Sequence, residues 1–370
     1  MNGVIPAPIA GLPWRIMLIL TAMSIFGASV LYSAAGGNFD PWAGKHLMRF
    51  FVFLAMALIL SRLPMDFWKA ITFPVYGAVL ILLIIVEVTG FVSGGSQRWI
   101  NIGFMNLQPS ELMKPAIILA VAWFFDRLPP SKISTMDALW PPVLLLSLPA
   151  GLVLIQPDLG TSLAIIFGAV VVAFLAGLPM RWFVGAGAAM VALIPLAYFF
   201  GLEEYQQRRV LTFLDPEADP LGAGYHVNQS AIAIGSGGFF GKGFLKGTQS
   251  HLDYLPEGHT DFVFATMAEE WGMIGGLALL FGFFLIFKWG LNVAVNSQTR
   301  YGQLVAAGMT CTIFFYAAIN LMMVMGMAPV VGIPLPFMSH GGSSMLTVMI
   351  CVGIIMSIER HPGIRLGQFG

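Results

Sequence analysis

Acidic residues gather in one long polar stretch of the chain, residues 201–261, which lies between hydrophobic runs. The stretch ends at Asp261, and Glu257, His259 and Thr260 come immediately before it. A carboxylate in such a cluster can act as a general base, which removes a proton from a hydroxyl nucleophile. The structural alternative is a helix cap, because Asp261 also begins an apolar run, where its charge would stabilise a helix N-terminus. Titratable groups gathered at a membrane surface favour the functional interpretation.

A second group of polar residues interrupts the apolar part of the chain. Glu111 and Lys114 are three positions apart, so a helix places both on one face, where they can form an ion pair. Two roles fit this pair equally: a salt bridge that neutralises two buried charges, or a site that binds substrate. Asp158 lies between two further apolar runs, where a turn is the structural alternative to a functional role.

Basic residues in the long polar stretch are candidates for binding an anionic group. Lys242 lies in the glycine-rich segment 235–247, whose backbone amides could hold a diphosphate together with this lysine. The segment matches neither the dinucleotide motif nor the P-loop motif, and a flexible turn at the membrane surface is the interpretation that we favour. Arg208 could contact a lipid headgroup or diphosphate, and a solvated surface charge explains it equally well.

Composition identifies the chain as an integral membrane protein. Hydrophobic residues make up 58% of the 370 residues, charged residues make up 10%, and the mean hydropathy is +0.83. A soluble domain of this length could not bury so much apolar surface. The formal net charge is zero, so nothing suggests a nucleic-acid partner. Cys311 and Cys351 lie in apolar runs, which indicates small hydrophobic side chains rather than a disulfide or a metal site.

Apolar runs that could cross a bilayer predict an all-α fold with ten transmembrane helices. The runs lie at about residues 14–34, 47–63, 70–90, 111–126, 139–156, 162–178, 182–201, 262–291, 303–326 and 343–358. Several are shorter than the roughly 20 apolar residues that a span needs, so their polar ends must face protein or a water-filled cleft. We expect residues 1–370 to form a single polytopic membrane domain, with residues 202–261 as a large loop between the seventh and eighth helices.

The distribution of lysine and arginine predicts the orientation. With the N-terminus inside, the inside segments hold ten basic residues: Arg15, Arg62, Lys69, Arg127, Lys132, Arg181, Lys288, Arg300, Arg360 and Arg365. The short outside segments then hold four: Lys45, Arg49, Arg98 and Lys114. The positive-inside rule therefore places both termini inside and the large loop outside.

Motifs along nearly the whole chain resemble the SEDS family of cell-wall polymerases, a GT-C-like group of membrane proteins. They lie at residues 108–114, 156–161, 214–225, 229–230, 241–243, 247–250, 255–265, 268–270 and 332–337. Residues 247–250 resemble the rod-elongation branch, RodA, more than the cell-division branch, FtsW. One position differs from the family, because His340 stands where the family usually has tyrosine. His340 could donate a hydrogen bond in place of that hydroxyl, or it could titrate.

The resemblance implies a peptidoglycan glycosyltransferase that polymerises lipid II into glycan strands during cell elongation. Lipid II is a disaccharide-peptide linked by diphosphate to an undecaprenyl chain. Because diphosphate is a good leaving group, the reaction needs one base and positive charge at the departing group, unlike the carboxylate pair of a glycosidase. We assign Asp261 as the base. The substrate-binding candidates, several of which the family places around an outward-facing cavity, are Glu111, Lys114, Asp158, Arg208, Lys242, Glu257, His259 and Thr260.

The resemblance also implies the partners and the location. The partners are a class B penicillin-binding protein, which crosslinks the strands, and other membrane proteins of the elongation complex. The location is the bacterial cytoplasmic membrane, with both termini in the cytoplasm. A divalent cation, Mg²⁺ or Mn²⁺, could assist the diphosphate, and the chain has no evident His/Cys cluster that would identify its ligands.

Two other functions use the same sequence features. A lipid II transporter would also need intramembrane Glu, Lys and Asp residues and helices broken by proline. Against it, the two halves of the chain show no repeat, and the polar residues concentrate on one side. A non-catalytic scaffold for the penicillin-binding protein is disfavoured only by the carboxylate cluster.

Overall fold

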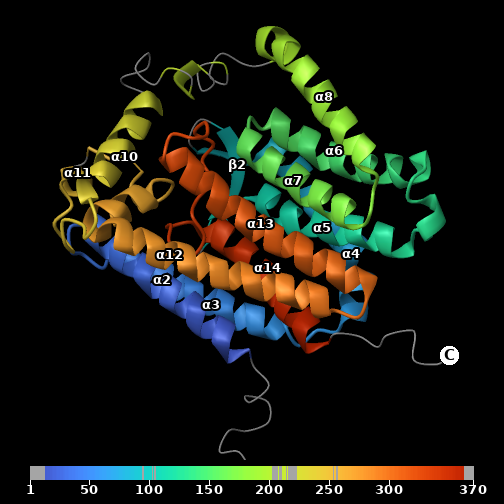
Figure 1. Ribbon diagram of the computed structural model, residues 1–370, viewed down its shortest axis with the longest axis horizontal. Coiled ribbons are helices and arrows are strands. Elements are labelled where there is room, and N and C mark those ends of the chain that lie inside the picture. Colours follow the sequence, from blue (N-terminus) through green and yellow to red (C-terminus); the bar gives the residue numbers. More distant parts are fainter. Residues whose placement is uncertain are drawn as a thin grey trace, which may run out of the picture.

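The protein folds into a helical bundle with one small sheet (Figure 1). The computed structural model describes residues 13–93, 96–101, 103, 106–201, 207, 211–213, 215, 223–252, 254–255 and 257–361. The long helices are α2 (Trp14–Ala34), α3 (Ala43–Leu60), α4 (Met65–Thr89), α5 (Pro109–Arg127), α6 (Trp140–Ile155), α7 (Leu159–Leu175), α8 (Met180–Leu196), α10 (Ala223–Gly237), α12 (Val263–Asn296), α13 (Arg300–Val324) and α14 (Gly342–Arg360). Shorter elements are the 3-10 turns η1 (Pro130–Lys132) and η2 (Met136–Ala138), the π turn η3 (Ala197–Gly201) and α11 (Thr248–His251).

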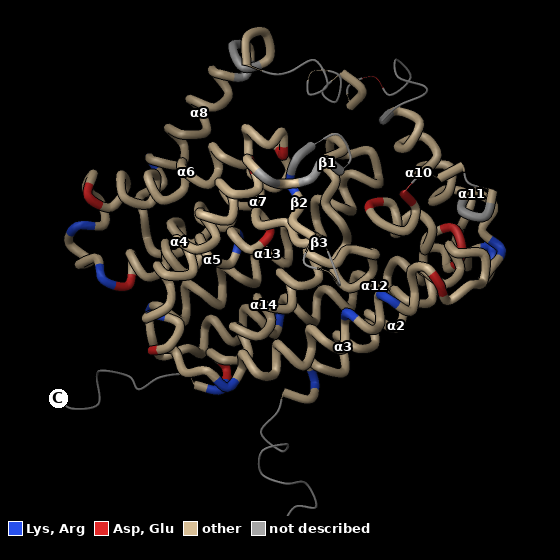
Figure 2. The backbone as a smooth tube through the Cα atoms, turned by 180° about the vertical axis from the view of Figure 1, so that it is seen from behind, with Lys and Arg blue, Asp and Glu red and all other residues tan. Residues whose placement is uncertain are grey.

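Each apolar run predicted from the sequence overlaps one of these helices over most of its length. Seven described helical segments are long and apolar enough to cross a membrane: α2, α3, α4, α6 together with the turn before it, α12, α13 and α14. The apolar helix α7 and the apolar part of α8 are shorter. Long stretches of the helices carry no charge at all (Figure 2). The chain is therefore a multi-pass membrane protein, and ten as the number of spans stays a prediction.

The core of the bundle lies around α5, α13 and α14. Figure 1 shows α12, α13 and α14 side by side, with α2 and α3 on one side and α4 to α7 on the other. α5 is buried over most of its surface from Pro109 to Phe125, and it contacts α4, α6, α7, α13 and α14. This burial explains how a short helix can hold Glu111 and Lys114 within the bundle, because their charges meet protein groups rather than lipid.

A small antiparallel sheet, which the sequence analysis did not anticipate, connects α4 to α5. Its strands are β1 (Phe91–Ser93), β2 (Ser96–Asn101) and β3 (Asn106–Leu107), in the order β1-β2-β3. The strands are too short to stand out from turn residues by alternation alone. The sheet matters for the site because β2 carries Arg98.

The glycine-rich segment 235–247 forms a joint with α12. That helix is interrupted at Gly272 (φ 61°, ψ −157°), a conformation that only glycine adopts easily. The carbonyls released by the break accept hydrogen bonds from the amides of Lys242 (2.9 Å, Glu269 O) and Gly243 (3.0 Å, Glu270 O). A Cβ atom on Gly272 would lie 2.3 Å from Gly241 N. The segment is therefore a structural joint rather than a phosphate loop or a free turn, and these two amides are not free to bind diphosphate.

Candidate active site

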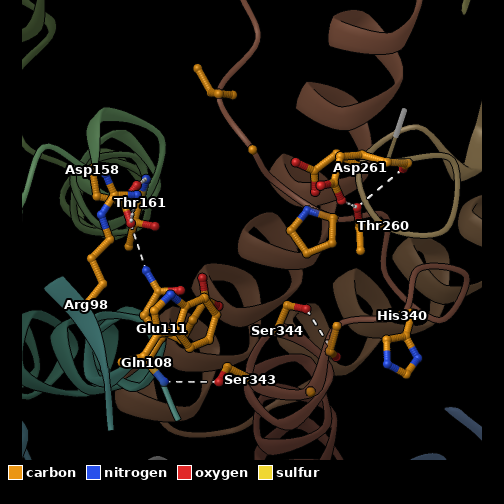
Figure 3. Close-up of a pocket in the computed structure, with 17 residues that line it drawn as sticks. Arg98, Gln108, Glu111, Asp158, Thr161, Thr260, Asp261, His340, Ser343 and Ser344 are labelled. Carbon is orange, nitrogen blue, oxygen red and sulfur yellow. Dashed lines mark hydrogen bonds and ion pairs between the residues drawn. The ribbon is translucent and has the colours of Figure 1, made fainter. Parts of the chain in front are cut away.

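One polar cleft brings together residues from distant parts of the sequence (Figure 3). It has a volume of about 620 Å³ and is lined from β2, the start of α5, the start of α7, the turn 257–261 and the segment 331–344. Five of the nine catalytic and binding candidates from the sequence line it, and so does His340: the five are Glu111, Asp158, Glu257, Thr260 and Asp261. We call this cavity the cleft.

Asp261 reaches the cleft from the turn that precedes α12. The helix begins at Val263 with Phe262 as its N-cap residue, so Asp261 lies one residue outside the capping position. Its neighbour Thr260 donates a hydrogen bond from Oγ1 to Glu257 Oε2 (2.5 Å), and both side chains line the cleft. Gly332 lies against this carboxylate: it has φ +69°, and a Cβ atom there would lie 3.5 Å from Asp261 Oδ2.

The backbone around Asp261 is fixed by three hydrogen bonds from another part of the chain. Asn320 Nδ2, on α13, donates to Asp261 O (2.7 Å) and also to Ile333 O (2.7 Å). Ser339 Oγ donates to Thr260 O (2.6 Å), and His340 N donates to His259 O (2.9 Å). Three consecutive carbonyls are thus held, and Asn320 is itself fully buried. This arrangement makes the position of Asp261 depend on α13 and on the loop before α14.

Asp158 lines the cleft on another side, at the N-cap position of α7. Its Oδ1 accepts a hydrogen bond from Thr161 N (3.1 Å), which caps α7, and its Oδ2 accepts one from Gln108 Nε2 (2.7 Å). Arg98 Nη1 lies 3.5 Å from the same Oδ2. Arg98 also donates to the carbonyls of Gln156 (Nε, 2.7 Å) and Pro157 (Nη2, 2.5 Å). Arg98 and Gln108 therefore hold the carboxylate in the cleft.

Glu111 and Lys114 form the predicted ion pair, and a tyrosine joins it. Lys114 Nζ donates to Glu111 Oε1 (2.6 Å) and to Tyr316 OH (2.6 Å), while Tyr316 OH donates to Glu111 Oε2. Lys114 is only 1% exposed and does not line the cleft, whereas Glu111 does. Lys114 therefore neutralises the charge of Glu111 from within the protein and does not itself line the cleft.

Two histidines, His259 and His340, lie in the turns around the cleft, and only His340 of these two lines it. His340 lines it and accepts a hydrogen bond at Nε2 from Arg49 Nη1 (3.3 Å). Burial, followed by the positive charge of Arg49, lowers the pKa of His340 to about 4, so its ring is neutral at neutral pH. His259 instead stacks on Trp42, with ring centroids 4.0 Å apart. Burial lowers the pKa of His259, and the charge of Glu257 opposes that shift.

Lys242, a predicted binding residue, is not among the residues that line the cleft. Lys242 Nζ forms an ion pair with buried Glu269 (2.7 Å), which also accepts hydrogen bonds from the amides of Thr248 (2.8 Å) and Gln249 (3.0 Å). Lys242 thus stabilises the joint with α12. Arg208 lies outside the described residues.

Sequence reasoning missed several residues of the site. Arg98 was counted only as an outside charge, Gln108 was noted only within a family motif, and Asn320 and Tyr316 were passed over as members of an apolar run. A signal existed for the last two, because a polar side chain in an apolar helix needs a buried partner. Within the part of the chain that the structure describes, no group of three or more His, Cys, Asp or Glu side chains could hold a metal ion.

The chain is similar to known proteins along almost its entire length. Residues 11–363 match the family model FTSW_RODA_SPOVE, described as cell cycle protein. The peptidoglycan glycosyltransferase MrdB of Escherichia coli K12 is 43% identical over 347 residues, 93% of this chain and 92% of the relative. Stage V sporulation protein E of Bacillus subtilis is 34% identical over 365 residues, 94% and 97% of the two chains.

Solved structures show the same fold. A chain from a peptidoglycan synthase complex that coordinates polymerization and crosslinking superposes with a TM-score of 0.81 at 31% identity, covering 94% of this chain and 98% of that one. The rod shape determining protein RodA of Thermus thermophilus superposes with a TM-score of 0.71 at 29% identity, covering 94% and 97%.

Proposed function

Because the chain belongs to the FtsW/RodA/SpoVE family, also called SEDS, we infer that it is a peptidoglycan glycosyltransferase. We propose that it polymerises lipid II into glycan strands during cell elongation, as the 43% identity to MrdB favours over the 35% identity to an FtsW from Trichlorobacter lovleyi. The observation that carries the proposal is the placement of Asp261 in a polar cleft opposite Glu111 and Asp158.

The cleft can supply what glycosyl transfer from a diphosphate requires. Asp261 accepts the proton of the acceptor hydroxyl while the acceptor oxygen bonds to the anomeric carbon. The bond between that carbon and the diphosphate oxygen breaks with inversion, and the electron pair leaves with the diphosphate. Among the described residues that line the cleft, Arg98 is the one side chain that is cationic at neutral pH. We therefore assign the stabilisation of the diphosphate to Arg98 rather than to Lys114.

A divalent cation is compatible with this site and has no assigned ligand. Magnesium commonly binds through one or two carboxylates together with substrate phosphates, so it does not require a cage built only from protein. Glu257 and Asp261 are carboxylates that face the cleft and could share such an ion with the diphosphate. When bound, the ion would neutralise charge that develops on the leaving group.

Labelled lipid II supplied to the purified protein in liposomes separates the three candidate functions. The glycosyltransferase gives polymer that a gel resolves into strands. A transporter moves the lipid between leaflets without polymer. A scaffold does neither, and either of the last two results would contradict the proposal.

We propose a class B penicillin-binding protein as the partner that crosslinks the strands, acting with other membrane proteins of the elongation complex. Support comes from the synthase complex in which polymerization and crosslinking are coordinated, since one of its chains shares this fold over nearly the whole length.

The proposed topology has ten spans, both termini in the cytoplasm and the loop 202–261 outside the bacterial inner membrane, within one polytopic domain. Single cysteines at Ser134 and Ser250, in a background without Cys311 and Cys351, are expected to respond oppositely to an impermeant thiol reagent. In intact spheroplasts position 250 should be labelled and position 134 should not. Labelling of position 134 alone would reverse the orientation.

Asn320 is expected to act as a positioning residue for Asp261. Asn320→Leu keeps the branching at Cγ but removes the two hydrogen bonds that hold Asp261 O and Ile333 O. Losing such buried bonds costs about 1–3 kcal/mol for each group left unpaired. We expect kcat for lipid II polymerisation to fall at least about tenfold, which corresponds to a rise of about 1.4 kcal/mol in the activation free energy. The change in KM should be smaller.

The matched control for Asn320 is Thr310→Val, on the same helix roughly 15 Å away. Thr310 is also buried, and its hydroxyl bonds only within the helix, to Ala306 O (2.7 Å). The control should keep kcat near normal and lower the melting temperature less than Asn320→Leu does, because it removes one bond within the helix. If Asn320→Leu changes the melting temperature but not kcat, the amide is structural only.

A further inference from the structure

A second cavity lies where α5 ends and α6 begins, at the opposite end of α5 from the cleft. It has a volume of about 350 Å³. Its walls are mainly apolar and include Trp123, Phe124 and Trp140, and its charged residues are Arg127, Lys132 and Asp137. An apolar pocket with a few charged groups at one edge suits an amphiphile with a charged head. We call it the α5–α6 pocket.

The surroundings place the α5–α6 pocket at the level of lipid headgroups. Trp140 is 58% exposed at the first position of α6, and the next turn exposes Val143 and Leu144, apolar side chains that face lipid in a spanning helix. Tryptophan at the end of a membrane helix characteristically lies at the boundary between headgroups and acyl chains. The pocket is therefore open to lipid and lies near the membrane surface.

Basic residues outnumber acidic ones around the pocket. The residues on its edge or bonded to its helices and loop are Lys69, Arg127, Lys132, Arg181 and Arg300 against Asp126 and Asp137. Lys69 is neutralised by Asp126 (2.8 Å). Lys132 pairs with Asp137 at 3.4 Å, and both side chains are more than half exposed, so a stronger anion can displace that contact cheaply.

The guanidinium of Arg127 has N–H groups that can donate hydrogen bonds to a ligand. It lies over the ring of Trp123, with Cζ 3.9 Å from the centroid, and Trp123 is fixed in turn by Phe73 (4.8 Å between ring centroids). In the described part of the chain, no group accepts a hydrogen bond from this guanidinium. A planar guanidinium that is held on a ring and has free donors is well suited to bind a phosphate.

The loop that closes the pocket is held in place before any ligand arrives. Arg181 Nη2 donates to Ser134 O (2.8 Å), and Arg300 Nη1 donates to Leu128 O (3.3 Å). Within the loop, the amide of Lys132 donates to Pro129 O (2.9 Å) and that of Thr135 to Lys132 O (3.0 Å). Such preorganisation lowers the entropy lost on binding.

From these contacts we propose that the α5–α6 pocket is a binding site for an anionic phospholipid. The phosphate lies between Arg127 and Lys132, and the glycerol backbone and first acyl carbons pack against Trp140 and Pro141. In the proposed topology the lipid belongs to the inner leaflet. Basic pockets between membrane helices recognise anionic headgroups in this way.

The test uses native mass spectrometry of the full-length protein, titrated with phosphatidylglycerol or phosphatidylcholine. We expect a saturable phosphatidylglycerol site that prefers this lipid over phosphatidylcholine. The double variant Arg127→Gln/Lys132→Gln should weaken phosphatidylglycerol binding about tenfold or more, because it removes both positive charges from the phosphate site. Trp140→Ala should weaken it while leaving both charges in place.

The matched control is Arg15→Gln/Lys288→Gln, which removes two exposed basic residues that lie outside the pocket and, in the proposed topology, on the same side of the membrane. It should leave binding within about twofold of the unmodified protein, since no pocket contact is lost. Equal losses in the two double variants would show a diffuse surface attraction and overturn the proposal. Glycerol phosphate that binds as tightly as the whole lipid would also overturn it, because the acyl chains would then have no role.

Discussion

Asp261→Asn is expected to remove glycan-strand synthesis while insertion, thermal stability and lipid II binding stay close to normal. Asparagine keeps the shape of the side chain but cannot accept the proton of the acceptor hydroxyl. Loss of a general base typically costs about 10²- to 10⁴-fold in rate. The bonds that hold this turn involve the carbonyl of residue 261, which the substitution does not alter. A gel-resolved polymerisation assay on the purified protein, with its partner present, measures the effect.

Glu257→Gln is the matched control for Asp261. Glu257 also lines the cleft, but its side chain is exposed and bound by Thr260, and nothing in the family resemblance places it at the reacting hydroxyl. We expect a smaller loss of rate than for Asp261→Asn. If Asp261→Asn still makes strands at roughly a tenth of the normal rate or better, Asp261 is not the base, and Asp158 or Glu111 becomes the candidate.

Single substitutions at Glu111 or Lys114 are expected to destabilise the protein severely. Both residues are buried and form an ion pair. Removing the charge of one residue therefore leaves the charge of the other buried without a partner of opposite sign. Breaking a buried pair in this way typically costs about 3–5 kcal/mol. Thermal unfolding in detergent should therefore show Glu111→Gln and Lys114→Met each well below the unmodified protein.

The double variant Glu111→Gln/Lys114→Met separates stability from function. It leaves no stranded charge, so the melting temperature should recover most of the loss. Strand synthesis should stay low, because Glu111 faces the cleft and its carboxylate is gone. Full activity in the double variant would mean that Glu111 and Lys114, with Tyr316, have only a structural role and do not take part in the reaction.

Local patterns in the sequence predicted the helices and part of the site. Apolar runs marked α2 and α14 to within a few residues, and the spacing of three between Glu111 and Lys114 predicted their contact, since both features depend on neighbours within a turn or two of helix. The long polar stretch likewise pointed to Asp261.

Contacts between distant segments of the chain could not be predicted from these local sequence patterns. Arg98 contacts Asp158 from β2, a strand of a sheet whose strands are only a few residues long. Asn320, on α13, donates a hydrogen bond to the carbonyl of Asp261. The glycine-rich segment looked like an anion-binding loop because its partner, the break at Gly272, is nearly thirty residues further along the chain and is visible only as backbone geometry.

Photo-crosslinking of lipid II tests most directly whether the cleft is where glycosyl transfer takes place. A photo-reactive amino acid is placed at Val331 or at Ser344, which line the cleft, and for comparison at Phe281, which is exposed on α12. We predict that labelled lipid II crosslinks at positions 331 and 344, that unlabelled lipid II competes, and that the crosslinks persist in the Asp261→Asn background. Crosslinking at position 281 alone, or crosslinks at 331 and 344 that lipid II does not compete away, would contradict the assignment of the cleft as the active site.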